Sequence, residues 1–349
     1  MQAVTFSEFR GPISLSDVPE PECPADGAVI EVRATGLCRS DWHGWQGHDA
    51  DIKDLPHVPG HEFAGVVAEV GCEVRHWKAG DQVTMPFVAG CGRCVECAAG
   101  HPQVCDDQFQ PGFTAWGSFA QRVAVRYADF NLIRLPEELD FATAASLGCR
   151  MATSYRAVTA QGQLHPGEWV AVHGCGGVGL AAVAIAAALG GRPIAVDIRD
   201  KPLELARKLG AEHTLNAGEV DDVPAAIRQL TGRGADLSLD ALGSRVTATN
   251  SILSLRKRGR HVQVGLLAGD QANPPLPMGP VVANELEIVG SHGLAARSYP
   301  ELLDLVVTGR LPAAKLVTRT LALSQAPAAL ETLNDFGEVG VAVVTDLGS

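Results

Sequence analysis

The chain has 349 residues, of which 46% are hydrophobic and 19% charged, an ordinary globular composition with enough apolar mass for two domains. Its formal net charge of −12 argues against nucleic acid or an anionic membrane as a partner, because both require a basic face. No apolar run of about 18 residues predicts a membrane span. The N-terminal segment lacks the basic start and apolar stretch of a signal peptide. We therefore expect a cytoplasmic protein whose nine cysteines are ligands or buried thiols.

Residues 1–150 predict a mostly β domain, because Gly and Pro separate short Val-rich runs such as 28–32 and 63–70. The pattern then changes, and strands alternate with Ala- and Leu-rich helices over residues 151–292. The expected strands are 169–172, 193–198, 235–240 and 261–264, and the expected helices are 180–189 and 203–209. Such alternation predicts a doubly wound parallel sheet with helices on both faces, hence an α/β protein. A helix at 299–308 and a strand at 341–345 follow, so we expect residues 293–349 to rejoin the first domain.

Four cysteines form one cluster within residues 90–106, with the spacing C-x2-C-x2-C-x7-C; they are Cys91, Cys94, Cys97 and Cys105. Two-residue gaps let neighbouring thiolates converge on one ion, and four sulfurs make the closed tetrahedral set of a structural zinc. Two disulfides and an iron–sulfur cluster are the alternatives. Ferredoxin-type runs, however, continue with three residues and then Cys-Pro, whereas seven residues precede Cys105. A closed site of this kind performs no chemistry.

A glycine-rich turn follows the expected strand 169–172 and opens an Ala-rich helix. Its residues match G-x-G-x-x-G and are Gly174, Gly176, Gly177, Val178 and Gly179. In this context the turn predicts a dinucleotide pyrophosphate at the helix N-terminus. Asp197 ends the next strand, where a carboxylate accepts hydrogen bonds from the adenosine ribose and repels a 2′-phosphate, so we favour NAD over NADP. Arg199 and Lys201 lie close by and could weaken this preference. The alternative is that they are solvated surface charges, which is the favoured interpretation for Arg199.

Three further pieces carry potential ligands for a second metal: Cys38, His61 and Cys149. Each alone is more often a core residue than a ligand. Together they offer two thiolates and an imidazole, and Cys2His with one open position is a ligand set of catalytic zinc.

With these motifs in this order, the whole chain resembles the zinc-dependent medium-chain alcohol dehydrogenase family. The resemblance implies a GroES-like first domain and a Rossmann-fold second domain. It implies that Cys38, His61 and Cys149 hold the catalytic zinc, that Glu62 lies beside the metal and replaces water transiently, and that Asp41 orients His61.

The resemblance also implies the reaction, a reversible hydride transfer between an alcohol and NAD that gives an aldehyde or ketone and NADH. Zinc lowers the pKa of the alcohol, and the zinc-bound alkoxide expels the hydride. The proton leaves through the hydroxyl of Ser40, the cofactor ribose and His43. Arg39 is expected to pair with the pyrophosphate. Other expected cofactor contacts, several of them around the nicotinamide, are Thr153, Leu242, Val264, Gly265, Leu266 and Ser291.

Two positions depart from the family pattern. Pro202 stands where members often have a ribose-binding lysine, with Lys201 one residue early, and His292 follows Ser291 where an apolar residue is usual. The family resemblance places five aromatic residues around the substrate channel, although two or three of them could be domain core: Trp42, Trp45, Phe87, Phe113 and Trp116. They favour an apolar or aromatic alcohol or aldehyde. Cys149 argues against polyol dehydrogenases, which usually carry Glu there.

Two other classes remain as competing hypotheses. A zinc-stabilised binding or regulatory protein with a vestigial nucleotide site would lack catalytic ligands or relay residues. A metal-free enoyl or quinone reductase of the same fold would lack Cys38, Cys149 and the four-cysteine cluster. By resemblance we expect a homotetramer, with a homodimer as the alternative.

Overall fold

The chain folds into two units in a computed structural model that describes residues 1–267, 269–335, 337 and 339–348. The first unit comprises Met1–Ala152, Gly293–Val307 and Val317–Ser349, and the second comprises Thr153–His292 and Thr308–Leu316. Most of the C-terminal tail therefore belongs with the N-terminal part, and the short segment Thr308–Leu316 packs with the second unit.

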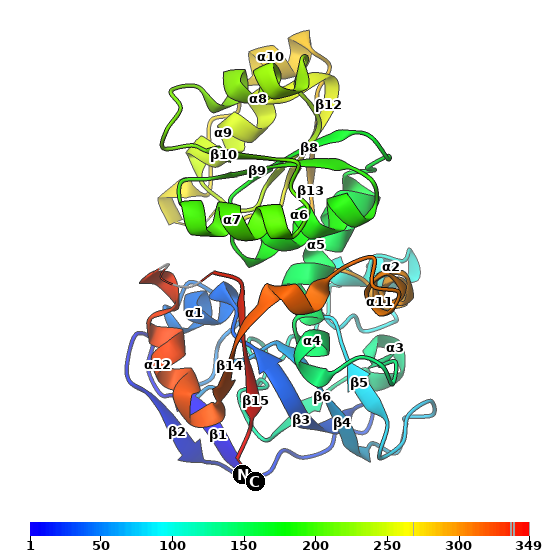
Figure 1. Cartoon of the computed structure of the whole chain (residues 1–349). Helices are drawn as coiled ribbons and strands as arrows, with labels where there is room; N and C mark the ends of the chain where they lie inside the picture. Colours follow the sequence, from blue (N-terminus) through cyan, green and yellow to red (C-terminus); the bar gives the residue numbers. More distant parts are fainter. Residues whose placement is uncertain (268, 336, 338, 349) are drawn as a thin grey trace. The chain divides into compact units, whose positions relative to one another are not determined.

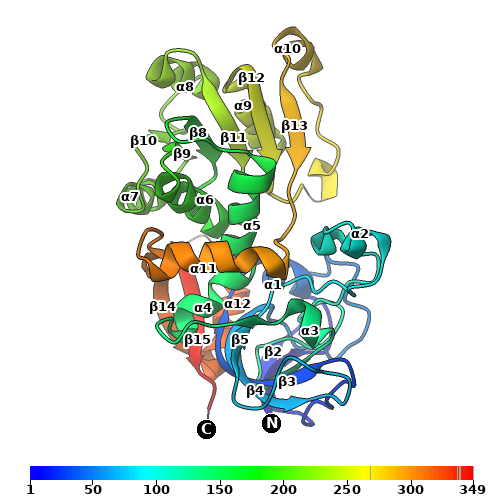
Figure 2. The ribbon, with the colours of Figure 1, turned by 90° about the vertical axis from the view of Figure 1, so that its right-hand side faces the viewer.

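The first unit is built mainly from strands (Figures 1 and 2). Its strands are β1 (Gln2–Phe6), β2 (Ile13–Asp17), β3 (Ala28–Gly36), β4 (Glu62–Val70), β5 (Gln82–Thr84), β6 (Arg122–Val125), β7 (Ile133–Arg134), β14 (Val317–Ala322) and β15 (Val341–Asp346). Its helices are α1 (Arg39–Trp45), α2 (Val95–Ala98), α3 (Ala128–Asn131), α4 (Phe141–Ala145), α11 (Tyr299–Val307) and α12 (Ala326–Glu331).

The main sheet of this unit has the order β14-β15-β3-β4-β5-β7, and β6 also pairs with β3. The central strands β3 and β4 are antiparallel, and their ends meet where Gly36 pairs with Glu62. This register decides the position of two candidate ligands. Cys38 comes two residues after the end of β3, and His61 comes immediately before β4. Both residues therefore lie where the C-terminal end of β3 meets the N-terminal end of β4.

The second unit is a six-stranded parallel sheet with the order β10-β9-β8-β11-β12-β13. Its strands are β8 (Trp169–His173), β9 (Arg192–Asp197), β10 (His213–Asn216), β11 (Ala235–Asp240), β12 (Leu255–Gln263) and β13 (Glu287–Gly290). Its helices are α5 (Ala152–Arg156), α6 (Gly177–Ala188), α7 (Asp200–Lys208), α8 (Val223–Thr231), α9 (Arg245–Leu253) and α10 (Met278–Ala283). Helices α6 and α7 cover one face and α8 and α9 the other (Figure 1).

The strand order reverses between β8 and β11, which is the switch point where doubly wound sheets bind dinucleotides at the carboxyl ends of their strands. The expected strands and helices are confirmed in both units, including the tail helix α11 and strand β15. One boundary was wrong. Strand β12 begins at Leu255, six residues before the expected start, because its first half is the polar run Arg256–Arg260, which gives no apolar signal.

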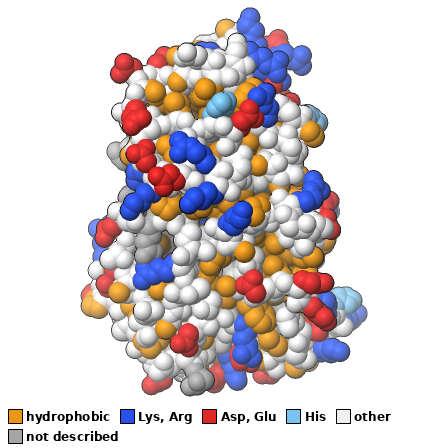
Figure 3. Space-filling view, viewed as in Figure 1, with side chains coloured by type: hydrophobic (Ala, Val, Ile, Leu, Met, Phe, Trp, Pro, Cys, Tyr) orange, Lys and Arg blue, Asp and Glu red, His pale blue; other side chains and the backbone are white. Residues whose placement is uncertain are grey.

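Within the described residues, no helix has both the length and the apolar character needed to cross a bilayer. Acidic and basic side chains are interspersed on the face viewed in Figure 3, with apolar side chains between them.

Candidate functional site

Helix α1 and the segment before β4 carry most of the candidate zinc residues. Cys38 is the N-cap of α1, and its backbone N–H donates to Oδ2 of Asp41 over 2.9 Å. The other oxygen of Asp41 accepts from the backbone N–H of Gly60 at 3.0 Å and from Nδ1 of His61 at 2.8 Å. One buried carboxylate therefore fixes the helix start and the His61 loop together.

Cys149 comes from a different element, the π-helical turn Leu147–Met151 that directly follows α4. Such turns are often found at functional sites. Gly148 packs against Glu62, since a Cβ atom on Gly148 would lie 3.1 Å from the Cα of Glu62. The close approach brings Cys149 to the ligands that precede β4.

The structure brings Cys38, His61, Glu62 and Cys149 together, with one ligand atom of each within 4.8 Å of the others. His61 is fully buried, and its Nε2 atom has no hydrogen-bond partner among the described residues. Because Nδ1 donates to Asp41, Nε2 carries the lone pair, and it lies beside two cysteine sulfurs. A buried, unpartnered lone pair next to two thiols fits a zinc ion.

Glu62 has a separate partner, Arg150, which follows the ligand Cys149. The backbone N–H and Nε of Arg150 donate to Oε1 of Glu62 at 2.9 and 3.0 Å, and the Nη2 atom donates to Oε2. Both carboxylate oxygens are thus engaged, and both residues are buried. Arg150 thus holds Glu62 beside Cys38, His61 and Cys149. These three residues alone would make a ligand set that leaves one coordination position of zinc open.

The charges around this centre favour a cysteine thiolate. A hydrogen bond from Cys149 holds the pKa of Cys38 well below its usual value and outweighs the effect of burial, and Arg150 acts in the same direction. Burial raises the pKa of the Glu62 carboxyl, and the neighbouring Arg150 opposes this rise. The thiolate is the form of cysteine that binds metal.

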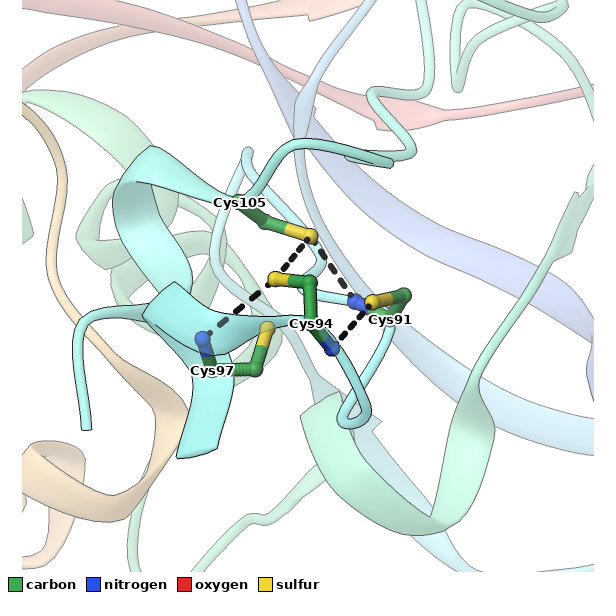
Figure 4. A group of neighbouring side chains, drawn as sticks. All are labelled: Cys91, Cys94, Cys97 and Cys105. Atoms are coloured by element: carbon green, nitrogen blue, oxygen red, sulfur yellow. Dashed lines mark hydrogen bonds between the residues drawn. The ribbon is translucent and has the colours of Figure 1, made fainter. Parts of the chain in front are cut away.

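The four-cysteine cluster forms a second site, between β5 and β6 in the sequence. Its four sulfur atoms lie within 4.8 Å of one another (Figure 4). The sulfurs of Cys94 and Cys105 are 3.6 Å apart, far from the ~2.05 Å of a disulfide and near the ~3.8 Å that tetrahedral zinc imposes. All the cysteines are free thiols, so the disulfide alternative is wrong.

Backbone N–H groups point at these sulfurs, as expected for thiolates. Those of Cys91 and Asp107 donate to Cys105, each at 3.3 Å, and that of Cys94 donates to Cys91 at 3.4 Å. The backbone N–H of Cys97 is the main cause that lowers the pKa of Cys94 to about 6. Burial raises the pKa values of Cys97 and Cys105, so a bound cation would be needed to hold all four sulfurs as thiolates.

The glycine turn of the second unit has the local geometry of a nucleotide site. Gly174 adopts φ +91°, and a Cβ on Gly179 would lie 1.8 Å from the carbonyl oxygen of Gly174, so neither position accepts a side chain without rearrangement. Asp197 braces the turn, because its Oδ2 accepts from the backbone N–H of Cys175 at 2.8 Å. Gly176 is the N-cap of α6, whose first residues include Gly177 and Val178.

Most other expected cofactor residues follow the carboxyl ends of three neighbouring strands. These residues are Leu242 after β11, Val264, Gly265 and Leu266 after β12, and Ser291 after β13. Asp240 ties the first two loops together: its carboxylate accepts from the N–H of Leu242, and its carbonyl accepts from those of Val264 and Gly265. The hydroxyl of Ser291 is buried without a hydrogen-bond partner among the described residues. Thr153 is buried on α5 of the same unit.

The expected relay residues lie on α1, three residues apart and hence on one side of that helix. The hydroxyl oxygen of Ser40 lies 3.8 Å from the sulfur of Cys38. His43 is half-buried and contacts a residue that the sequence did not single out, His48, through a 3.0 Å separation of their Nδ1 atoms. Arg39 is the first residue of the helix and is exposed.

The five aromatic residues have different surroundings. Phe113 and Phe87 contact the ring of His61, with centroids 5.0 and 6.0 Å away. Trp42 and Trp45 pack against the core of the first unit. Trp116 packs against Ala3, Val58 and Ala120. Some of these rings are thus domain core, the alternative that the sequence left open.

Two residues of the site escaped prediction. Arg150 pairs with Glu62 from 88 positions along the chain, and only its place beside Cys149 could have signalled the role. His48 follows a helix whose end sequence analysis did not predict, and Gly47 would have been the signal for it.

Two families match the chain, "Alcohol dehydrogenase GroES-like domain" over residues 24–137 and "Zinc-binding dehydrogenase" over 177–308. An alcohol dehydrogenase of Geobacillus stearothermophilus is 33% identical over 89% of this chain and 90% of that relative. An NAD-dependent alcohol dehydrogenase of Sulfurisphaera tokodaii is 33% identical over 97% of this chain and 98% of its own. Among solved structures, alcohol dehydrogenase TADH from Thermus sp. ATN1 superposes with a TM-score of 0.90 at 31% identity, covering 99% of this chain and all of that one. The chain therefore belongs to the zinc-dependent medium-chain alcohol dehydrogenase family.

Proposed function

We propose that the protein is an NAD-dependent alcohol dehydrogenase that interconverts an alcohol with its aldehyde or ketone, using a zinc ion held by Cys38, His61 and Cys149. The observation that carries the proposal is the unpartnered Nε2 of buried His61 beside two cysteine sulfurs. The engagement of Glu62 by Arg150 supports an open fourth position. Such a position distinguishes a catalytic from a structural zinc site.

When bound, the zinc ion supplies the Lewis acidity that lowers the pKa of an alcohol, and NAD accepts the hydride. The chain's own residues then have distinct tasks. Asp41 fixes the tautomer of His61 and keeps Nε2 available. Phe87 and Phe113, which contact His61, make the surroundings apolar and favour an apolar or aromatic substrate. Ser40 and His43 move the alcohol proton away, with Ser40 next to Cys38.

For the cofactor, we propose the glycine turn and the carboxyl ends of β11, β12 and β13 as the binding surface. The backbone N–H groups at the start of α6 suit a pyrophosphate. Asp197 stands at the end of β9, where its carboxylate favours the free ribose hydroxyls of NAD over a 2′-phosphate. Arg199, whose Nε is 3.5 Å from Oδ1 of Asp197, lowers the preference for NAD over NADP.

We further propose two zinc ions per chain with separate tasks, which a pair of variants tests. Cys38→Ser should lose one zinc and all measurable NADH formation, and Cys94→Ser should lose the other zinc and stability while the folded fraction keeps its turnover. Zinc is measured by atomic emission, activity by NADH absorbance with primary, secondary, aromatic and polyol alcohols, and folding by circular dichroism. Wild-type turnover in Cys38→Ser, or none with any alcohol in the wild type, would contradict the proposal.

The domain boundaries at residues 150 and 292 are proposed on the two compact units, which change over at Ala152 and at His292.

A homo-oligomer, a tetramer or else a dimer, is supported by exposed apolar side chains near the edge strand β13: Met278, Val282 and Ile288. Light scattering after size exclusion tests it, and a monomeric mass at micromolar concentration would refute it.

A further inference from the structure

Helix α1 ends in a turn that brings a second histidine onto His43. The backbone N–H of Gly47 donates to the carbonyl of Gly44 at 2.9 Å, and that of His48 donates to the carbonyl of His43 at 3.0 Å. This pair of hydrogen bonds is the Schellman arrangement, which brings the second residue after the cap close to the third residue from the helix end. Gly47 adopts φ +75°, which glycine accommodates without strain.

An apolar pair frequently makes this contact in Schellman motifs, whereas here two imidazoles do. The Nδ1 atoms of His43 and His48 are 3.0 Å apart, and their ring centroids are 5.3 Å apart. The indole of Trp42 contacts both rings edge-on, at 5.1 and 6.0 Å, and limits their movement. A hydrogen bond between two ring nitrogens requires one to donate and the other to accept.

His43 and His48 differ in their access to water: His43 is half-buried, and His48 is exposed. We propose that His48 is the exit residue of the proton relay, taking from Nδ1 of His43 the proton that alcohol oxidation releases and passing it to water. The proposal rests on the function proposed above, and it assigns a step to a residue outside the motif by which the family was identified.

The proton balance is simple. Oxidation of one alcohol by NAD yields one proton besides the hydride. A proton that arrives at Nε2 of His43 makes that ring a cation, which then gives its Nδ1 proton to the lone pair on Nδ1 of His48. His48 in turn releases its Nε2 proton to water, and exchange with water returns both rings to their starting tautomers. In aldehyde reduction the same steps run backwards.

The charges around the two histidines favour transfer of a proton by His43 over its retention. Burial, the nearby Arg39 and His48 lower the pKa of His43 to about 4, and Cys38 opposes them. The segments packed against α1 carry the ionisable side chains Glu8, Arg10, Asp49, Glu331 and Asp335. A ring with so low a pKa does not retain a proton at neutral pH, and it needs an acceptor close by.

The test follows proton release with a pH-indicator dye in a stopped-flow single turnover, alongside NADH absorbance. In His48→Gln, proton release should slow by about tenfold or more, a typical effect of losing a proton-transfer partner. Rising concentrations of HEPES should restore it, because a dissolved base can replace the exposed ring. His76→Gln is the matched control. His76 is an exposed histidine of the same unit, and its backbone N–H, which the substitution keeps, donates to Asp129. Proton release by this variant should be as fast as in the wild type.

A second readout needs neither turnover nor cofactor. Nitrogen-15 NMR of the zinc-loaded protein should show a higher pKa for His43 in His48→Gln, because His48 is one of the groups that lower this pKa. His48→Asn serves if the first variant fails to fold. Wild-type alcohol oxidation together with an unaltered, buffer-independent proton release in His48→Gln overturns the exit role and leaves the proposed function standing. Absence of alcohol oxidation in the wild type overturns both.

Discussion

Asp41 accepts a hydrogen bond from Nδ1 of His61 over 2.8 Å, and its other oxygen accepts one from the backbone N–H of Cys38. One carboxylate therefore positions two of the three proposed zinc ligands. In Asp41→Asn one side-chain atom becomes a donor, which cannot serve both partners. We expect zinc affinity at the catalytic site to fall about 10- to 100-fold, as for other residues that orient a ligand.

Competition with a chromophoric chelator measures this affinity. Asp49→Asn is the control, because the Asp49 carboxylate accepts from the backbone N–H of Asp51 in the same segment. Equal chelator competition by the two variants would refute the positioning role of Asp41.

The ion pair between Glu62 and Arg150 predicts that a single and a double variant differ strongly in their free energy of unfolding. Arg150→Met leaves the buried Glu62 carboxylate without its partner, and breaking a buried pair on one side costs about 3–5 kcal/mol. The double variant Glu62→Gln, Arg150→Met removes both charges and should recover most of that loss. Urea unfolding of the zinc-free protein, followed by tryptophan fluorescence, gives these free energies. If the double variant were as unstable as Arg150→Met, packing rather than charge would be responsible.

The role of Asp197 predicts a change of cofactor preference. Asp197→Ser should weaken the binding of NAD more than that of NADP. The ratio of their kcat/KM values should narrow by about 10- to 100-fold, the effect of losing charge-assisted hydrogen bonds. Both cofactors should weaken somewhat, because Asp197 also holds the N–H of Cys175. Asp200→Asn, three residues on and bonded to Asn216, should keep the wild-type ratio. A ratio unaltered in Asp197→Ser would remove the ribose contact from the proposal.

His173 predicts a pH dependence of stability in the second unit. Burial lowers its pKa from 6.5 to about 3. Between these values the unfolded chain binds a proton that the folded chain does not, so stability falls as pH falls, by at most about 1.4 kcal/mol per pH unit for this group. His173→Asn should show a shallower decline between pH 6.5 and 4 in urea unfolding. The stability of His165→Gln, a change at an exposed histidine, should fall with pH as that of the wild type does. Equal slopes of stability against pH in all three proteins would contradict the prediction.

Apolar patterning made most of the fold predictable. The alternation of strands and helices from Trp169 onward predicted the parallel sheet, and the spacing of Cys91 to Cys105 predicted their convergence. Helix α1 went unpredicted because it has only seven residues and contains Gly44, so neither length nor propensity distinguishes it.

Long-range pairing was the other limit on prediction. Nothing in the sequence near Glu62 indicates Arg150, since their contact depends on the π-helical turn at Leu147–Met151 and the close approach of Gly148. The surroundings of the aromatic residues likewise depend on the fold: Phe113 contacts His61 and also belongs to the core against which Trp42 and Trp45 pack. Such contacts follow from the tertiary fold rather than from local pattern.

The link between Glu62 and Arg150 joins residues that each directly follow a proposed zinc ligand, His61 and Cys149. Two ligand-bearing segments are thereby fastened to each other by protein groups alone, and Asp41 fastens the third. We therefore expect the proposed catalytic centre to keep its shape without the ion. Metal loading is then a late event that reorganises little backbone, and an apoprotein prepared with a chelator should regain activity as fast as zinc can reach the site.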